Sequence, residues 1–75
     1  MPKRQPHPTL KVLGRRIRAL RKRQKWSQER LADEAAIDRS YMSGIERGIR
    51  NISVLNLIKI AQALREPVTG LFERD

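Results

Sequence analysis

Near the start of the chain, apolar side chains recur at spacings of three and four residues, which define one face of a helix. They are Leu10, Leu13, Ile17 and Leu20. Thr9 can serve as the N-cap, and the basic stretch 21–25 suits the negative end of the helix dipole. The pattern predicts a helix over about residues 10–24. Residues 1–8, proline-rich and charged, predict a flexible basic arm.

A second, shorter apolar pattern follows Ser27, a residue type that caps helices well. Its inward positions are Leu31, Ala32 and Ala35. We expect this helix to end near Ala35.

Asp38 is a natural N-cap for a third helix over residues 39–46, and Gly48 is a natural residue just beyond its end. Only residues 36 and 37 remain to join the second and third helices. The two helices must therefore turn sharply on each other.

The third predicted helix has a weak helical composition and an unexplained polar side. Gly44 in its interior costs about 1 kcal/mol relative to alanine, and the strongly apolar residues are only Ile37, Met42 and Ile45. The polar side chains between them are Arg39, Ser40, Tyr41 and Ser43. No core obviously needs these four, so they suggest a binding surface.

Ser53 can cap a fourth helix. Its expected apolar stripe is Val54, Leu57, Ile58, Ala61 and Leu64, which leaves Leu55 and Ile60 off the stripe. Pro67 fits the start of a short fifth helix with apolar residues Val68, Leu71 and Phe72. No segment alternates as a strand would. The chain is therefore predicted to be all-α, with five helices in one domain over residues 9–75.

Composition narrows the classes of protein. The 75 residues include no cysteine and one histidine, His7, so disulfides, thiolate metal sites and zinc are not expected. No membrane-spanning run or signal peptide is visible. No nucleophile, base and orienting group cluster by motif, and no glycine-rich phosphate loop is present. We expect a soluble cytoplasmic protein without metal or cofactor, and not an enzyme.

Charge is distributed unevenly along the chain. Seventeen Lys and Arg oppose eight Asp and Glu, and ten of these bases but none of the acids precede Trp26. Such asymmetry favours a polyanionic partner, either nucleic acid or an anionic membrane surface. The alternative is a basic face kept only for solubility.

Two short helices joined by a tight turn, with small Ala32 inside the first, describe a helix-turn-helix. In that motif the N-terminal part of the second helix enters the DNA major groove. The polar side chains at 39–43 would then read DNA, and Gly44 would permit close approach to phosphates. The alternative is that they form a merely solvated helix face.

A long segment of the sequence also resembles a known family. The residues "SQERLADEAAIDRSYMSGIERGIRNISVLNLIKIAQAL" look like the lambda-repressor-like (XRE-type) helix-turn-helix regulators, the Cro and phage-repressor branch. The resemblance runs from about Leu13 to Phe72. The words "RSYMSGIERG" and "NISVLNLIKIA" are especially similar to the controller proteins of restriction–modification systems, which are dimeric regulators.

The resemblance implies roles for individual residues. Gln28 would bond a DNA phosphate, Arg39 and Ser40 would reach base edges, and Tyr41 and Ser43 would contact phosphate or a base. Arg50 and Asn51 would meet the DNA backbone or minor groove. Arg21 and Glu46 correspond to an ion pair that ties the first helix to the third.

The chain departs from the family pattern at three positions. Ala36 stands where the turn usually has glycine, Arg65 stands where glycine usually ends the fourth helix, and Glu66 replaces an apolar residue.

The sequence thus predicts a double-stranded-DNA-binding transcriptional regulator that acts as a homodimer, with no small-molecule ligand implied. The residues expected in the dimer interface are Ile52, Leu55, Val68, Leu71 and Phe72. Alternatively, Leu71 and Phe72 close the monomer core. Rival functions are membrane-surface binding by the first helix and an antitoxin that also binds a protein toxin. Trp26 is expected to be a core or lid residue.

Overall fold

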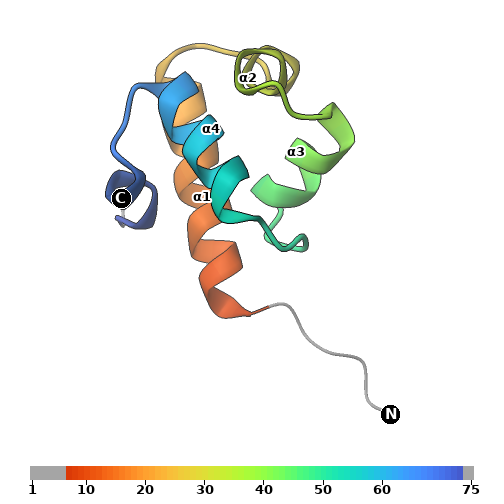
Figure 1. Ribbon diagram of the computed structural model, residues 1–75, viewed down its shortest axis with the longest axis vertical. Helices are drawn as coiled ribbons and strands as arrows, with labels where there is room; N and C mark the ends of the chain where they lie inside the picture. The colour runs from red at the N-terminus through yellow and green to blue at the C-terminus, as the bar shows by residue number, and fades with distance from the viewer. Residues whose placement is uncertain (1–6, 74–75) are drawn as a thin grey trace.

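The computed structural model describes residues 7–73, which form four α-helices and one 3₁₀ helix (Figure 1). The elements in chain order are α1 (Pro8–Arg23), α2 (Gln28–Ala35), α3 (Arg39–Glu46), α4 (Val54–Leu64) and the 3₁₀ helix η1 (Val68–Phe72). The described residues contain no strand, which confirms the all-α prediction. The predicted caps Ser27, Asp38 and Ser53 each accept a backbone N–H in the first turn of their helix.

The start of α1 differs from the prediction. His7, not Thr9, is the N-cap, and its Nδ1 accepts the backbone N–H of Thr9 at 3.1 Å. Pro8 explains the earlier start, because proline fixes φ near its helical value and lacks the N–H that a first helical residue leaves unpaired. The helix thus takes in the end of the predicted arm, whose residues 1–6 lie outside the described part of the chain.

The predicted fifth α-helix is a single stretch of 3₁₀ helix. The backbone N–H of Gly70 donates to the carbonyl oxygen of Pro67 at 2.9 Å, and this three-residue spacing is the one that a 3₁₀ helix uses. Five residues are too few to repay the cost of nucleating an α-helix, and Gly70 in the middle lowers helix propensity further. The prediction of five α-helices was therefore wrong for the last element, which is a 3₁₀ helix.

The core lies where α1 packs on α3 and η1 while α2 packs on α3 and α4. Figure 1 shows α3 and η1 on opposite flanks of α1. The side chains buried completely are Ile17, Leu31, Met42, Ile60 and Leu71. The core is thus shared among all five elements, and η1 also packs on α4.

The predicted apolar stripe of α4 is confirmed at Ala61 and Leu64 and wrong at Val54, Ile58 and Ile60. Ile60 is fully buried, whereas Val54 is 72% exposed and Ile58 36% exposed. The buried positions include Ala61 and Leu64, so the inward face follows the spacing 60, 61 and 64. Both registers satisfy helical periodicity, and the partner helices decide between them.

Arg16 is buried, although it is one of the ten basic residues that precede Trp26. Its Nε donates to the carbonyl oxygen of Gly70 at 2.8 Å, and its Nη2 lies 3.1 Å from Glu73 Oε2. The same nitrogen lies 3.8 Å from Glu66 Oε1. Arg16 therefore fastens the C-terminal segment to α1 and does not belong to the charge available for a polyanion.

Gly14 lets α1 approach the end of α3 closely. A Cβ atom placed there would clash with the carbonyl oxygen of Ile45 and would lie 2.6 Å from that of Glu46. Backbone carbonyls cannot rotate out of the way as a flexible side chain does. Only glycine therefore fits this crossing without moving one of the helices.

Gly14→Ala should lower the free energy of unfolding by about 1–3 kcal/mol, the usual cost of overpacking. In an unobstructed helix interior the same change stabilises by about 0.5–1 kcal/mol, so the sign itself is informative. Chemical denaturation followed by circular dichroism measures it, with Arg18→Ala on the exposed side of α1 as the control. A Gly14→Ala variant as stable as the parent would contradict the close crossing.

Candidate nucleic-acid interface

The turn between α2 and α3 is closed by two backbone bonds. The N–H of Ile37 donates to the carbonyl of Ala32 at 2.9 Å, and that of Ala36 donates to Asp33 at 3.1 Å. This pattern ends a helix in a left-handed residue, and Ala36 adopts φ 55° and ψ 47°. Alanine occupies this conformation at a cost of about 1 kcal/mol, since its Cβ crowds the following carbonyl. The turn that presents α3 thus forms without glycine.

Four of the predicted DNA-contact residues converge on one surface hollow of about 260 Å³. The hollow is lined by Gln28, Arg39, Ser40, Ser43 and Arg47. Arg39 and Ser40 are exposed on the first turn of α3, and Gln28 begins α2 beside them. The turn therefore brings the starts of α2 and α3 to the same surface, as DNA reading by this motif requires.

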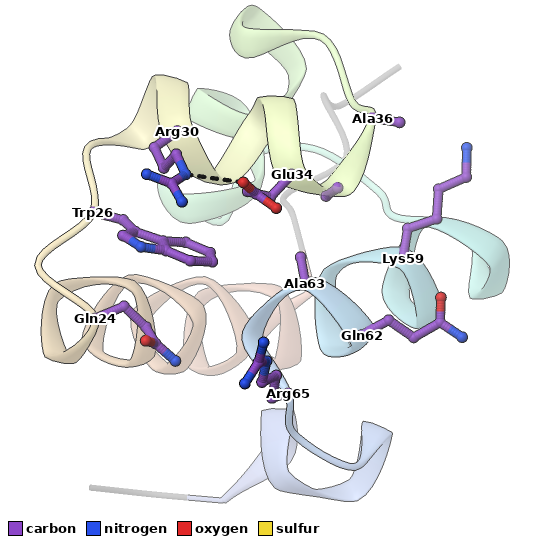
Figure 2. Close-up of a pocket in the computed structure, with 10 residues that line it drawn as sticks. Gln24, Trp26, Arg30, Glu34, Ala36, Lys59, Gln62, Ala63 and Arg65 are labelled. Carbon is purple, nitrogen blue, oxygen red and sulfur yellow. Dashed lines mark hydrogen bonds and ion pairs between the residues drawn. The ribbon is translucent and has the colours of Figure 1, made fainter.

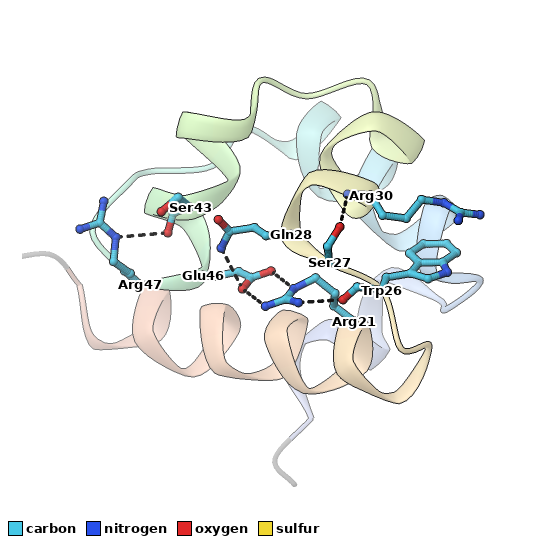
Figure 3. Close-up of polar contacts among 8 residues, drawn as sticks. All are labelled: Arg21, Trp26, Ser27, Gln28, Arg30, Ser43, Glu46 and Arg47. Carbon is cyan, nitrogen blue, oxygen red and sulfur yellow. Dashed lines mark hydrogen bonds and ion pairs between the residues drawn. The ribbon is translucent and has the colours of Figure 1, made fainter.

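Arg47 also lines this surface, although it was not among the residues predicted to contact DNA. It follows α3 directly, is exposed, and its Nε lies 3.4 Å from the carbonyl oxygen of Ser43, a long contact (Figure 3). The available signal was spacing, because positions 39, 43 and 47 repeat every four residues along one helical face.

Arg21 and Glu46 form a bidentate ion pair between α1 and the end of α3 (Figure 3). Arg21 Nε lies 2.7 Å from Glu46 Oε2, and Nη2 lies 3.0 Å from Oε1. The Arg21 side chain is 11% exposed and that of Glu46 is 3% exposed. Arg21 Nη1 also donates to the carbonyl of Trp26 at 2.8 Å. The expected pair is present and reaches the chain segment that enters α2.

Gln28 is attached to this pair. Its Nε2 donates to Glu46 Oε1 at 3.2 Å. A side-chain amide nitrogen carries two hydrogens, so this bond uses one donor and leaves a second. The pair consequently holds the Gln28 amide in place while keeping an N–H available at the hollow.

The side chain of Tyr41 makes a hydrogen bond within the protein that the sequence did not indicate. Its hydroxyl donates to the backbone carbonyl of Asn51 at 2.6 Å. A phenol has one hydrogen to donate, and a phosphate oxygen only accepts. In the free protein this side chain therefore fastens the loop that carries Arg50 and Asn51, both of which are exposed, and its contact with a phosphate or a base edge stays a prediction.

Gly44 also has a different role from the one expected. A Cβ atom on Gly44 would collide with Cγ of Arg50, whose side chain covers it. The missing side chain thus makes room for the Arg50 stem and not for a phosphate group. Together with the Tyr41 bond, this packing fixes the loop after α3 against the helix.

The predicted dimer residues separate into two groups. Leu71 is fully buried in the monomer core, so its place in an interface is wrong and the core alternative holds for it. Leu55, Val68 and Phe72 are 61%, 36% and 45% exposed, and Ile52 is half-buried. Exposed apolar residues that the prediction missed are Ile49, Val54 and Ile58. The α4 register error explains the last two, because it placed them in the core.

Residues 7–73 hold no cluster of three or more potential metal ligands. Among the helices that the structure describes, none has the length and apolar character to cross a bilayer. Trp26 is half-buried against the core, and the Arg30 guanidinium carbon lies 4.9 Å from its ring centroid.

Glu46→Ala should lower the free energy of unfolding by about 3–5 kcal/mol, because it strands the nearly buried Arg21 guanidinium. A double variant, Arg21→Met with Glu46→Leu, should recover most of this loss, since no charge is then left without a partner. Thermal and chemical denaturation provide the measurement.

The exposed pair Arg30–Glu34, 3.0 Å apart, supplies the control. Glu34→Ala should cost less than about 1 kcal/mol, as surface pairs do. Equal losses at Glu46 and Glu34 would show that the Arg21–Glu46 pair behaves as a surface pair.

Comparison with known proteins agrees with this geometry. The helix-turn-helix family HTH_3 matches residues 17–71. The control protein C.BamHI of Bacillus amyloliquefaciens is 44% identical over 54 residues, covering 71% of this chain and 67% of that protein. The crystal structure of the restriction–modification controller C.AhdI from Aeromonas hydrophila superposes with a TM-score of 0.81 at 45% identity, covering 83% of this chain and 94% of that one.

The structure of the biofilm regulator SinR in complex with DNA gives a TM-score of 0.77 at 35% identity, over 81% of this chain and 98% of that chain. Some curated relatives are longer, and the chain spans only 43% and 50% of two of them. The match to more than half of the sequence establishes that this chain belongs to the HTH_3 helix-turn-helix family.

Proposed function

We propose that the chain is a sequence-specific, double-stranded-DNA-binding transcriptional regulator that acts as a homodimer on a two-fold-related operator. The observation that carries this proposal is the single hollow lined by donors from the starts of α2 and α3. Its action is occupancy of a DNA site in the cytoplasm and involves no chemical reaction. The similarity to SinR, a relative solved with DNA, supports the choice of ligand.

The residues of the hollow divide by what they can reach. Arg39 and Ser40 begin α3, the end of the helix that enters the major groove, so they are assigned to base edges. Arginine bonded to guanine O6 and N7 is the most frequent specific contact. Gln28, Ser43 and Arg47 border the hollow and are assigned to phosphates, which position the protein on the duplex without reading sequence.

The loop after α3 supplies a second contact. Arg50 and Asn51 are exposed and held against α3 by the Tyr41 hydrogen bond. We assign them to the DNA backbone or minor groove. A loop fixed in the free protein loses less conformational entropy when it binds, which favours affinity.

Dimerisation follows from the apolar residues left on the surface. The exposed residues of this patch are Val54, Leu55, Ile58, Val68 and Phe72, from α4 and η1. These residues lie on two elements that contact each other, and a two-fold interface would cover the same residues on both copies. Two recognition helices related by a two-fold axis would then meet half-sites about one helical turn apart.

A finer assignment is control of a restriction–modification system. The similarity to the controllers C.BamHI and C.AhdI favours it over the antitoxin alternative. A restriction endonuclease and a methyltransferase encoded beside this chain would support it, whereas a neighbouring toxin would support the alternative.

Arg39→Ala should weaken binding to the preferred site by about 1–3 kcal/mol and relax the preference at one base pair. Gln28→Ala should weaken binding to all sequences alike, because phosphate contacts carry no direct sequence information. The preferred site comes from selection out of a random DNA pool, and fluorescence anisotropy at fixed salt measures both variants on single-base changes of that site. An unaltered base preference in Arg39→Ala would refute the placement of α3.

Leu55→Glu should weaken self-association and operator binding together while the helix content stays unchanged. The reason is that a charge in an apolar interface loses its hydration without gaining a partner. Sedimentation equilibrium at micromolar concentration and circular dichroism provide the readouts, with Arg18→Ala on the exposed side of α1 as the control. A strictly monomeric parent chain that still binds one half-site tightly would contradict the dimer.

A further inference from the structure

A second, larger cleft of about 830 Å³ lies away from the hollow that faces DNA. It opens between α2, α4 and the segment that follows α1 (Figure 2). Figure 2 shows Trp26 and Arg30 at one end of it and Lys59 and Gln62 at the other, with Ala63 between them. None of the residues assigned to DNA lines this cleft. Its volume lies in the range typical of small-molecule sites, about 300–1,000 Å³.

The charged lining of the cleft is predominantly positive. Arg30, Lys59 and Arg65 contribute cations, and Glu34 contributes the single anion. Glu34 is already bound to Arg30 at 3.0 Å. Within residues 7–73, Lys59 and Arg65 form no ion pair with an acidic side chain. Two cations are therefore available to a ligand that enters the cleft.

The remaining lining combines two glutamine side chains with apolar ones that include a flat ring. Trp26 forms one wall, and its guanidinium neighbour Arg30 lies over the ring. Ala35 and Ala63 add small side chains that leave the space between the helices open. An apolar wall beside separated cations suits a planar apolar molecule that carries negative groups.

The backbone around the cleft is unusual as well. Among residues 7–73, three non-glycine residues have positive φ: Ala36 and Arg65 line this cleft, and Lys25 directly precedes Trp26, which also lines it. Arg65 ends α4 at φ 57°, in the conformation that favours glycine. Arginine at this position carries backbone strain that glycine would avoid, but it places a guanidinium at the cleft.

From these observations we propose that the cleft between α2 and α4 binds a small aromatic organic anion, with Lys59 and Arg65 neutralising its acidic groups against the wall formed by Trp26. The site is separate from the DNA-facing hollow. The proposal does not depend on the assignment of DNA contacts.

The test uses the chain's single tryptophan, whose indole N–H gives one resonance in a ¹H–¹⁵N correlation spectrum of the full chain. The probe is benzene-1,3-dicarboxylate at constant ionic strength. We expect a saturable shift of the Trp26 indole resonance together with the backbone amides of residues 59–65. Benzamide, which has the ring without the charge, and sulfate, which has the charge without the ring, should each bind at least about tenfold more weakly, the factor that one charge-assisted hydrogen bond contributes.

Two glycine variants separate binding from stability. Arg65→Gly should melt no lower than the parent chain, because glycine suits a left-handed residue, yet it should bind the probe about tenfold more weakly. Ala36→Gly relieves the same kind of strain without removing a charge and should bind as the parent does. Arg18→Ala removes one positive charge outside the cleft and controls for net charge.

Three outcomes would overturn the proposal. They are the absence of a saturable shift at Trp26, equal binding of sulfate, and equal loss of affinity in Arg65→Gly and Arg18→Ala. The last two would mean that the probe responds only to the overall positive charge of the chain.

Discussion

The carboxylate of Glu46 and the guanidinium of Arg21 meet where α1, the entry to α2 and the end of α3 come together. Taking two charges out of water is costly, and here the cost is offset by short bonds that occupy both carboxylate oxygens. The same guanidinium donates a hydrogen bond to the carbonyl oxygen of Trp26, and the same carboxylate accepts one from the side-chain amide of Gln28. The pair thus links α1, the start of α2 and the end of α3 through the polar contacts of two side chains.

Once α3 is placed, the polar groups on it divide between holding the protein together and remaining available. The hydroxyl of Tyr41 holds the loop after the helix, and the stem of Arg50 packs over Gly44 while this residue stays exposed. Arg39, Ser40 and Arg47 stay on the outer side. The basic residues of α1 divide in the same way, because Arg16 and Arg21 serve the interior and Arg15, Arg18 and Lys22 remain exposed. Net charge alone therefore overstates what this protein offers to a polyanion.

How far the sequence predicts the fold depends on the range of the interaction involved. Caps such as Ser27 and Asp38 act within three residues, so their positions follow from the local sequence. The buried face of α4 does not, since Val54 and Ile60 fit two helical registers and only contact with α2 and η1 selects one. The site follows the same rule. Arg39, Ser40 and Ser43 lie on the polar side of one short helix and could be predicted, whereas the bond between Tyr41 and Asn51 depends on the path of a loop.

The anchorage of Arg16 has a consequence for how the chain reaches this structure. Its bonds to Gly70 and Glu73 span 54 and 57 residues, nearly the full described length. The helices themselves form through local contacts on microsecond timescales, whereas a closure of this span must wait until the ends of the chain meet. Both acceptors follow Arg16 by more than fifty residues, so its guanidinium stays solvated until they have been synthesised. We therefore expect the contact between α1 and the η1 segment to form after the helices, as the step that joins the C-terminal segment to the rest of the domain.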